Sequence, residues 1–182
     1  MNKIIIFIVI LSSIYAKNLQ VNILYLEELV KNPPALSNVI KKPKDSGIKG
    51  VQLALSDSTK SSKFFKQEYF LKEFRSYNKK ELIKTFKQWV KDKNTFIIVN
   101  VTSDTLDEIS HIKEFQNAIL FNMGNFDNEL RKTKCKKNIL HTIPSYAMLS
   151  DALVQFLIVR NWKKWILIKG DKERSEERRV GK

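Results

Sequence analysis

Short apolar runs that alternate with helical patterns constrain the fold of this chain more than any other feature of its sequence. The runs lie at residues 21–26, 69–74, 95–101, 118–122 and 139–142, and polar residues bound each of them. Apolar runs of this length predict strands that are covered on both faces, which is the pattern of a parallel sheet. A parallel sheet in turn requires a helix or a long connection between consecutive strands.

Helical patterns occupy most of those connections. Residues 79–91 carry apolar residues on one helical face, and Ser46 and Gly47 suit the entrance of a helix whose apolar residues run from Ile48 to Leu55. Residues 105–115 predict a shorter helix, whereas the three prolines within residues 31–45 predict a loop. Strands that alternate with helices predict an α/β fold with a doubly wound, Rossmann-like parallel sheet.

The pattern begins again beyond Pro144. Residues 147–159 predict a helix and residues 165–169 predict a strand. These two elements are either a sixth strand of the same sheet with its helix, or the first unit of a second lobe that the chain enters near Pro144.

The first sixteen residues have the order of a secretory signal peptide. Lys3 precedes an uncharged apolar run at residues 4–11, and Ala16 is a small residue at the natural cleavage position. The run is too short for a transmembrane helix, which needs about 20 apolar residues. We therefore expect export to the periplasm with a mature chain that starts near Lys17. Because no cysteine follows the cleavage position, we do not expect a lipoprotein.

The charge and the cysteine content narrow the class of protein further. The 182 residues carry a formal charge of +14, but the lysines are spread among Asn and Ile along the whole chain, which indicates compositional bias rather than a nucleic-acid partner. Cys135 is the only cysteine, so no intramolecular disulfide is available. Residues 172–182 change abruptly to an Arg- and Glu-rich text without apolar periodicity, and we expect this tail to be non-native or disordered.

Three segments and one cysteine carry a resemblance to a known family: GIKGVQLALSDSTKSSKFF at residues 47–65, LFNMGNFDNELR at 120–131, Cys135, and NILHTIPSYAMLSDALVQFL at 138–157. In this order they resemble type I periplasmic substrate-binding proteins of ABC transporters. The resemblance is to the branched-chain amino-acid-binding family, in the branch associated with PQQ-dependent (quinoprotein) alcohol dehydrogenase systems. It implies two α/β lobes that enclose a solute. Residues 17–145 would form the first lobe and residues 146–171 the start of a truncated second lobe. Ser62 and Lys66 depart from the family, which tends to have glycines there.

The candidate site follows from the sheet rather than from the resemblance. In open α/β sheets ligands bind at the carboxyl ends of the strands, near the point where strand order switches. That rule selects six residues as ligand contacts: Glu27, Thr102, Ser103, Asn122, Gly124 and Ser145. Their hydroxyls and nearby helix N-terminal amides suit a carboxylate or another polar oxygen. The alternatives are that Thr102 and Ser103 only cap the next helix, that Gly124 is only a turn residue, and that Glu27 with Glu28 is solvated.

The sequence contains no catalytic or metal-binding motif. His111, His141 and Cys135 are too few and too scattered for a transition-metal site, and there is no nucleophile elbow or glycine-rich phosphate loop. We therefore expect a monomeric, non-enzymatic solute-binding protein without a cofactor. It would capture a small polar molecule, present it to an inner-membrane ABC permease and bind no nucleic acid. The alternatives are a periplasmic accessory or sensor protein of a PQQ-dependent dehydrogenase system and an exported α/β enzyme.

Overall fold

Five strands and four α-helices follow one another along the described part of the chain, which in the computed structural model comprises residues 19–30, 43, 45–62 and 64–166. The strands are β1 (Leu19–Glu28), β2 (Gln67–Ser76), β3 (Phe96–Asn100), β4 (Ile119–Asn122) and β5 (Ile139–His141). The helices are α2 (Ser46–Ser62), α3 (Lys79–Lys91), α4 (Ser103–Ser110) and α5 (Tyr146–Val159), with 3₁₀ turns η1 (Lys113–Asn117) and η2 (Glu129–Arg131). The signal peptide and the tail expected at residues 1–16 and 172–182 lie outside the described residues.

The five strands form one parallel sheet in the order β2-β1-β3-β4-β5. The five strands predicted between residues 21 and 142 are all present, so the expected doubly wound α/β fold is confirmed. One helix differs from expectation. The pattern at residues 105–115 predicts a single helix, but α4 ends at Ser110 and η1 begins only at Lys113. The His111 N–H donates to the carbonyl of Glu108, which tightens the last turn and ends α4 before the apolar pattern ends.

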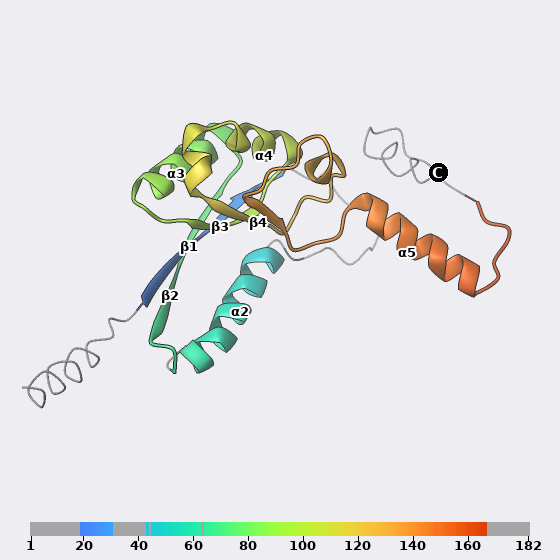
Figure 1. Cartoon of the computed structure of the whole chain (residues 1–182), viewed down its shortest axis with the longest axis horizontal. Helices are drawn as coiled ribbons and strands as arrows, with labels where there is room; N and C mark the ends of the chain where they lie inside the picture. Colours follow the sequence, from blue (N-terminus) through green and yellow to red (C-terminus); the bar gives the residue numbers. More distant parts are fainter. Residues whose placement is uncertain (1–18, 31–42, 44, 63, 167–182) are drawn as a thin grey trace, which may run out of the picture.

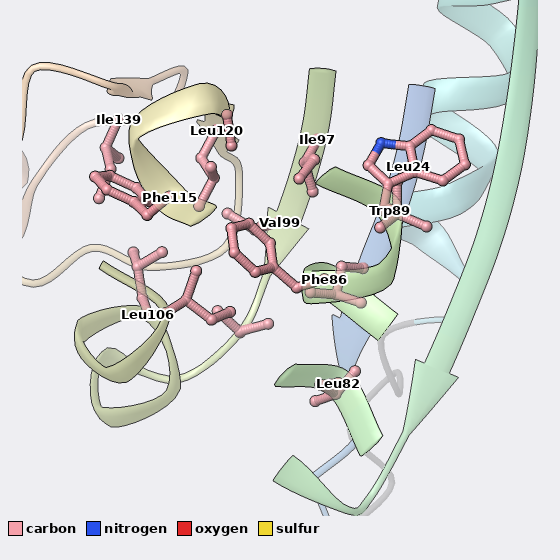
Figure 2. Packing of buried hydrophobic residues seen from close by; sticks show 14 of the residues in the cluster. Leu24, Leu82, Phe86, Trp89, Ile97, Val99, Leu106, Phe115, Leu120 and Ile139 are labelled. Carbon is pink, nitrogen blue, oxygen red and sulfur yellow. The ribbon is translucent and has the colours of Figure 1, made fainter. Parts of the chain in front are cut away.

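α3 and α4 cover one face of the sheet and enclose the main hydrophobic core (Figures 1 and 2). α3 begins at a capped end, because the side chain of Asn78 accepts a hydrogen bond from the Lys80 N–H at 3.0 Å. Its apolar face then meets the sheet residues that point to this side. The core contains Leu24, Leu26, Leu82, Phe86, Trp89, Val90, Ile97, Val99, Leu106, Ile109, Phe115, Leu120 and Ile139.

Among the described residues, α2 is the helix that covers the opposite face (Figure 1). Ile48 and Val51 of this helix pack with Tyr25 in a much smaller cluster. An apolar groove with a volume of about 420 Å³ remains between α2 and the strands beside it. It is lined by Val21, Ile23, Gly50, Val51, Ala54, Phe96, Ile98, Phe121, Met123 and Thr142. This face of the sheet is therefore only partly closed by the described residues.

β1 and β2 extend beyond the rest of the sheet as a two-stranded ribbon. They pair over ten residues, from Leu19 with Gln67 to Glu28 with Ser76, whereas β1 pairs with β3 only from Ile23 to Glu27. The ribbon starts at Lys66, whose carbonyl accepts a hydrogen bond of 2.8 Å from the Leu19 N–H. Lys66 adopts a φ of 51°, so a lysine occupies a left-handed position that a glycine would adopt without strain.

α5 projects away from the sheet (Figure 1). Although residues of the helix are mostly apolar, none of its side chains is buried among the described residues. Trp165 and Ile166, which follow it, have no strand pairing, and the other residues of the strand expected at 165–169 are not described. No helix in the described part of the chain is long and apolar enough to span a membrane.

Candidate solute-binding edge of the sheet

The order of the strands places the switch point between β1 and β3. From β1 the chain passes to β2 on one side of it, and from β2 to β3 on the other side, so α2 and α3 leave toward opposite faces. The carboxyl ends of β1 and β3 consequently diverge into a crevice, which is where ligands bind in open α/β sheets. The residues that end these strands are Glu27, Glu28 and Asn100.

Glu27 occupies the centre of this edge. Its register partners are Arg75 on β2 and Asn100 on β3. One carboxylate oxygen lies 2.6 Å from Arg75 Nε, and the other accepts a hydrogen bond of 2.9 Å from Asn100 Nδ2. Glu27 is only 8% exposed, so both oxygens of a nearly buried carboxylate are held by neighbouring strands. The alternative of a solvated Glu27 is therefore not what the structure shows.

Tyr25 lies beneath Glu27 on the same face of β1. Burial, and after it the negative charge of Glu27, raises the pKa of the Tyr25 phenol to about 12. The side chain is fully buried, and its hydroxyl makes no well-formed hydrogen bond to any described residue. The phenol therefore stays neutral across the physiological pH range and contributes a dipole, not a charge, to the edge.

Two glycines allow the backbone to pack closely against the side chains at this edge. A Cβ on Gly124 would overlap Asn100 Oδ1 and would lie 3.2 Å from the Cα of Asn100. A Cβ on Gly47, at the start of α2, would collide with the hydroxyl of Tyr25. Gly124 thus has a packing role that goes beyond a turn, since the loop after β4 rests directly on the last residue of β3.

Glu28 faces the opposite side of the sheet and holds the entrance of α4. One of its carboxylate oxygens accepts hydrogen bonds from the N–H and the hydroxyl of Thr102, at 2.9 and 2.8 Å. Thr102 is the N-cap of α4, because its hydroxyl oxygen accepts from the Thr105 N–H at 3.4 Å. The capping role expected as an alternative for Thr102 is therefore present in the structure.

Asn122 organises the loop that follows β4. Its side chain is fully buried, and its Nδ2 donates to the Asn125 carbonyl at 2.7 Å while its Oδ1 accepts from the Asn125 N–H at 3.0 Å. The same Nδ2 lies 2.9 Å from His141 Nδ1. Burial, and next the positive charge of Arg131, lowers the pKa of His141, which favours the neutral ring beside Asn122.

Asn125 links this loop to the start of α4. Its Nδ2 donates to Ser103 Oγ at 3.0 Å. Asn125 is 7% exposed, so the contact fixes the loop against the helix entrance. Ser145 lies further along the same edge, where its Oγ accepts from the Met148 N–H at 3.2 Å and caps α5.

Comparisons with known proteins bear on this arrangement through the fold alone. No protein-family model matches the sequence, and no curated protein matches it. Among solved structures, an ABC transporter substrate-binding protein from Desulfitobacterium hafniense is similar with a TM-score of 0.61 and 12% identity, over 88% of this chain and 44% of that one. A possible leucine/isoleucine/valine-binding protein from Rhodopirellula baltica SH 1 is similar with a TM-score of 0.52 and 13% identity, over 79% of this chain and 37% of that one.

The fold is that of these solute-binding proteins. Since the identities are low, the likeness establishes the α/β fold and no more. The chain spans less than half the length of either protein. The expected resemblance to ABC-transporter binding proteins is confirmed at the level of fold, and its finer assignment to a PQQ-linked branch stays a prediction.

The structure groups most of the residues selected from the sequence at one edge. Glu27 and Gly124 meet at Asn100, and Ser103 and Asn122 meet at Asn125. Sequence reasoning missed the residues that join them, which are Arg75, Asn100 and Asn125. The strand-end rule itself contained a signal for Arg75 and Asn100, because β2 and β3 carry them at or next to their last residues. Among the described residues no group of three or more His, Cys, Asp or Glu side chains comes together as a metal site.

Proposed function

We propose that the chain is the solute-binding component of an ABC-type importer, and that the carboxyl edge of its sheet supplies one wall of the binding cleft. The observation that carries the proposal is the position of the Glu27, Arg75 and Asn100 group at the switch point of a sheet whose fold is shared with substrate-binding proteins. The edge combines a buried carboxylate, hydroxyls and a helix entrance, which suits a small polar molecule.

Several polar groups at the edge are already paired within the chain, and these groups would orient the others. Glu28 fixes Thr102, and Asn122 and Asn125 fix the loop beside Ser103. The Ser103 hydroxyl, which its hydrogen bond with Asn125 orients, and the first turn of α4 are the groups we assign to direct contact, since N–H groups at a helix start favour a carboxylate or another anionic oxygen. Binding to such a prearranged edge requires little reordering of side chains.

A second wall would come from a second lobe that begins at α5. The apolar side chains of α5 are exposed, which is the expected state of a helix whose packing partners lie in another part of a protein. Residues 17–145 and 146–171 would then belong to different lobes. Closure of two lobes around a solute would present it to an inner-membrane permease, and no bond needs to form or break.

The proposed place of action is the periplasm, since the sequence begins with a signal-like segment. The link to quinoprotein alcohol oxidation rests on the sequence resemblance of residues 47–65, 120–131 and 138–157. Mass spectrometry of the exported protein tests the first point: we expect a mature N-terminus near Lys17, and a retained Met1 or a lipidated terminus would contradict it.

The direct test is calorimetry on the product of the complete reading frame with a panel of amino acids, carboxylates and small alcohols. We expect one class to bind, and Ser103→Ala to weaken that binding by about fivefold to tenfold, because a lost hydrogen bond is worth about 1 kcal/mol. Ser58→Ala on the exposed side of α2 is the matched control and should bind normally. Turnover of a compound, or a solute that binds equally well to the Ser103 variant, would overturn the assignment.

A further inference from the structure

Four lysines form a continuous stripe on the outer face of α3. In the sequence these lysines are spread among other residues, and only the helix brings Lys80, Lys84, Lys87 and Lys91 into line. Their spacings of four, three and four residues place them one above another on a helix, over a length of about 16 Å. All four are exposed, whereas the buried residues of α3 lie on the opposite side. We call these four residues the lysine stripe.

The positive charge of the lysine stripe is not neutralised within the described part of the chain. The ion pairs formed there involve other lysines, such as Lys79 with Glu108 and Lys134 with Asp107. Two acidic residues adjoin the stripe in sequence: Glu81 accepts hydrogen bonds from Ser76 and Asn78, and Asp92 forms no ion pair with a lysine of the stripe among the described residues. Like charges three and four residues apart destabilise a helix, so the stripe does not serve the fold of α3, which its buried face stabilises.

The composition of the stripe indicates the kind of surface that it fits. Protein interfaces concentrate their binding energy in Trp, Tyr and Arg. Bidentate recognition of a single phosphate favours the planar guanidinium group of Arg. The stripe contains neither aromatic residues nor arginine, and only Ile83 and Gln88 join its lysines around a shallow hollow. Flexible ammonium groups in a row suit many mobile anions better than one fixed partner. A bilayer with anionic headgroups is such a surface.

We propose that the lysine stripe binds the anionic headgroups of a phospholipid bilayer and holds α3 against the membrane surface. Most of the formal charge of +14 lies outside the expected signal peptide and tail, and it adds a long-range attraction in the same direction. This inference is independent of the solute-binding proposal, because α3 covers one face of the sheet (Figure 1) and the stripe lies on the side of α3 opposite to its buried residues. It would keep the protein close to a membrane without a lipid anchor.

The test is sedimentation of the exported protein with vesicles that contain phosphatidylglycerol or only phosphatidylcholine. The variant K80Q/K84Q/K87Q/K91Q removes the stripe, and K49Q/K132Q/K137Q/K163Q removes the same charge from dispersed, exposed positions. Each lysine near an anionic surface contributes about fivefold to binding, so the first variant should lose about a hundredfold or more on anionic vesicles. The control variant should lose much less, and added salt should remove the difference.

Two further measurements make the outcome decisive. Circular dichroism and urea unfolding of both variants should show that the fold is retained, since only exposed lysines are replaced and the replacement in α3 is a good helix former. Phosphatidylcholine vesicles report any binding through the exposed apolar residues of α5. Equal losses in the two variants, or binding that ignores headgroup charge, would overturn the proposal. Stripe-dependent binding to soluble polyglutamate but not to anionic vesicles would also overturn it and would indicate an acidic macromolecule instead.

Discussion

On one face of the sheet α3 and α4 exclude water from Leu24, Val99 and Leu120, whereas on the other face α2 leaves Phe96 37% and Leu140 47% exposed. The closed face contains aliphatic and aromatic side chains in one large cluster. The open face contains the apolar groove and, at its carboxyl end, the polar group around Glu27. The difference indicates that stability is concentrated on one side of the sheet and polar recognition at the edge of the other.

Truncation of one aromatic residue on each face gives the largest test of this comparison. Phe86→Ala on the closed face should lower the free energy of unfolding by about 3–5 kcal/mol, because it leaves a cavity in a packed core. Phe121→Ala in the groove should cost about 1–2 kcal/mol, since that side chain is only half-buried. Urea unfolding followed by circular dichroism measures both. Equal losses would mean that the groove is closed in solution.

Removal of the central carboxylate is the next test. Glu27→Gln should destabilise the protein by about 2–3 kcal/mol, because the charge of Arg75 then faces a neutral amide in a nearly buried place. Glu73→Gln is the matched control, since Glu73 approaches the same arginine at 3.7 Å but is exposed. It should cost less than about 0.5 kcal/mol. Thermal unfolding at low and high salt measures both substitutions. If Glu27→Gln and Glu73→Gln lower the stability by similar amounts, the buried pair has no special role.

One glycine at the polar edge and one beside the apolar groove differ in the space around them. Gly124→Ala should destabilise the protein by about 1–2 kcal/mol, since the new Cβ meets the side chain and backbone of Asn100. Gly50→Ala, within α2, should stabilise it by about 0.5–1 kcal/mol, because the added Cβ has no atom within 4 Å beyond its chain neighbours and the backbone of its own helix. Opposite signs are expected in parallel urea titrations, and a shared sign would contradict the geometry.

The buried phenol of Tyr25 provides the smallest test. Its folded pKa of about 12 lies above the unfolded value of 10, so the folded state binds the proton more tightly. The corresponding stability is present below pH 10 and is lost as the pH rises toward 12. We expect the native protein to lose about 1 kcal/mol more than Tyr25→Phe between pH 9 and 11. If Tyr25→Phe does not change the pH dependence of the free energy of unfolding, the phenol is exposed to water.

The closed face could be predicted from the sequence, and the open face only in part. Apolar periodicity gives both the strands and the buried side of α3, because hydrophobic burial depends on spacing along one element. The Glu27, Arg75 and Asn100 group could not be read in the same way, since its members come from three strands and meet through sheet register. Asn125 was missed because it lies three residues beyond β4, where loop geometry and not periodicity sets the contacts.

The end of α4 shows the limit of periodicity within a single element. The apolar positions continue from Leu106 through Ile109 and Ile112 to Phe115, and they do face the core. The backbone nevertheless changes from α4 to a 3₁₀ turn between them. Apolar spacing therefore predicted which side chains are buried but not how the chain carries them there.

The first strand in the sequence, β1, lies inside the sheet between β2 and β3, and this has a consequence for the order in which the molecule can assemble. Asn100, which bonds to Glu27, follows it by 73 positions. A chain that emerges N-terminus first, from a ribosome or from a translocation channel, must keep residues 19–28 uncovered until β3 has arrived. Such non-local parallel pairing forms slowly and exposes strand edges meanwhile. The time that the chain takes to emerge thus sets a lower bound on its folding time. A chaperone that holds the emerging chain would bind β1 before all other strands.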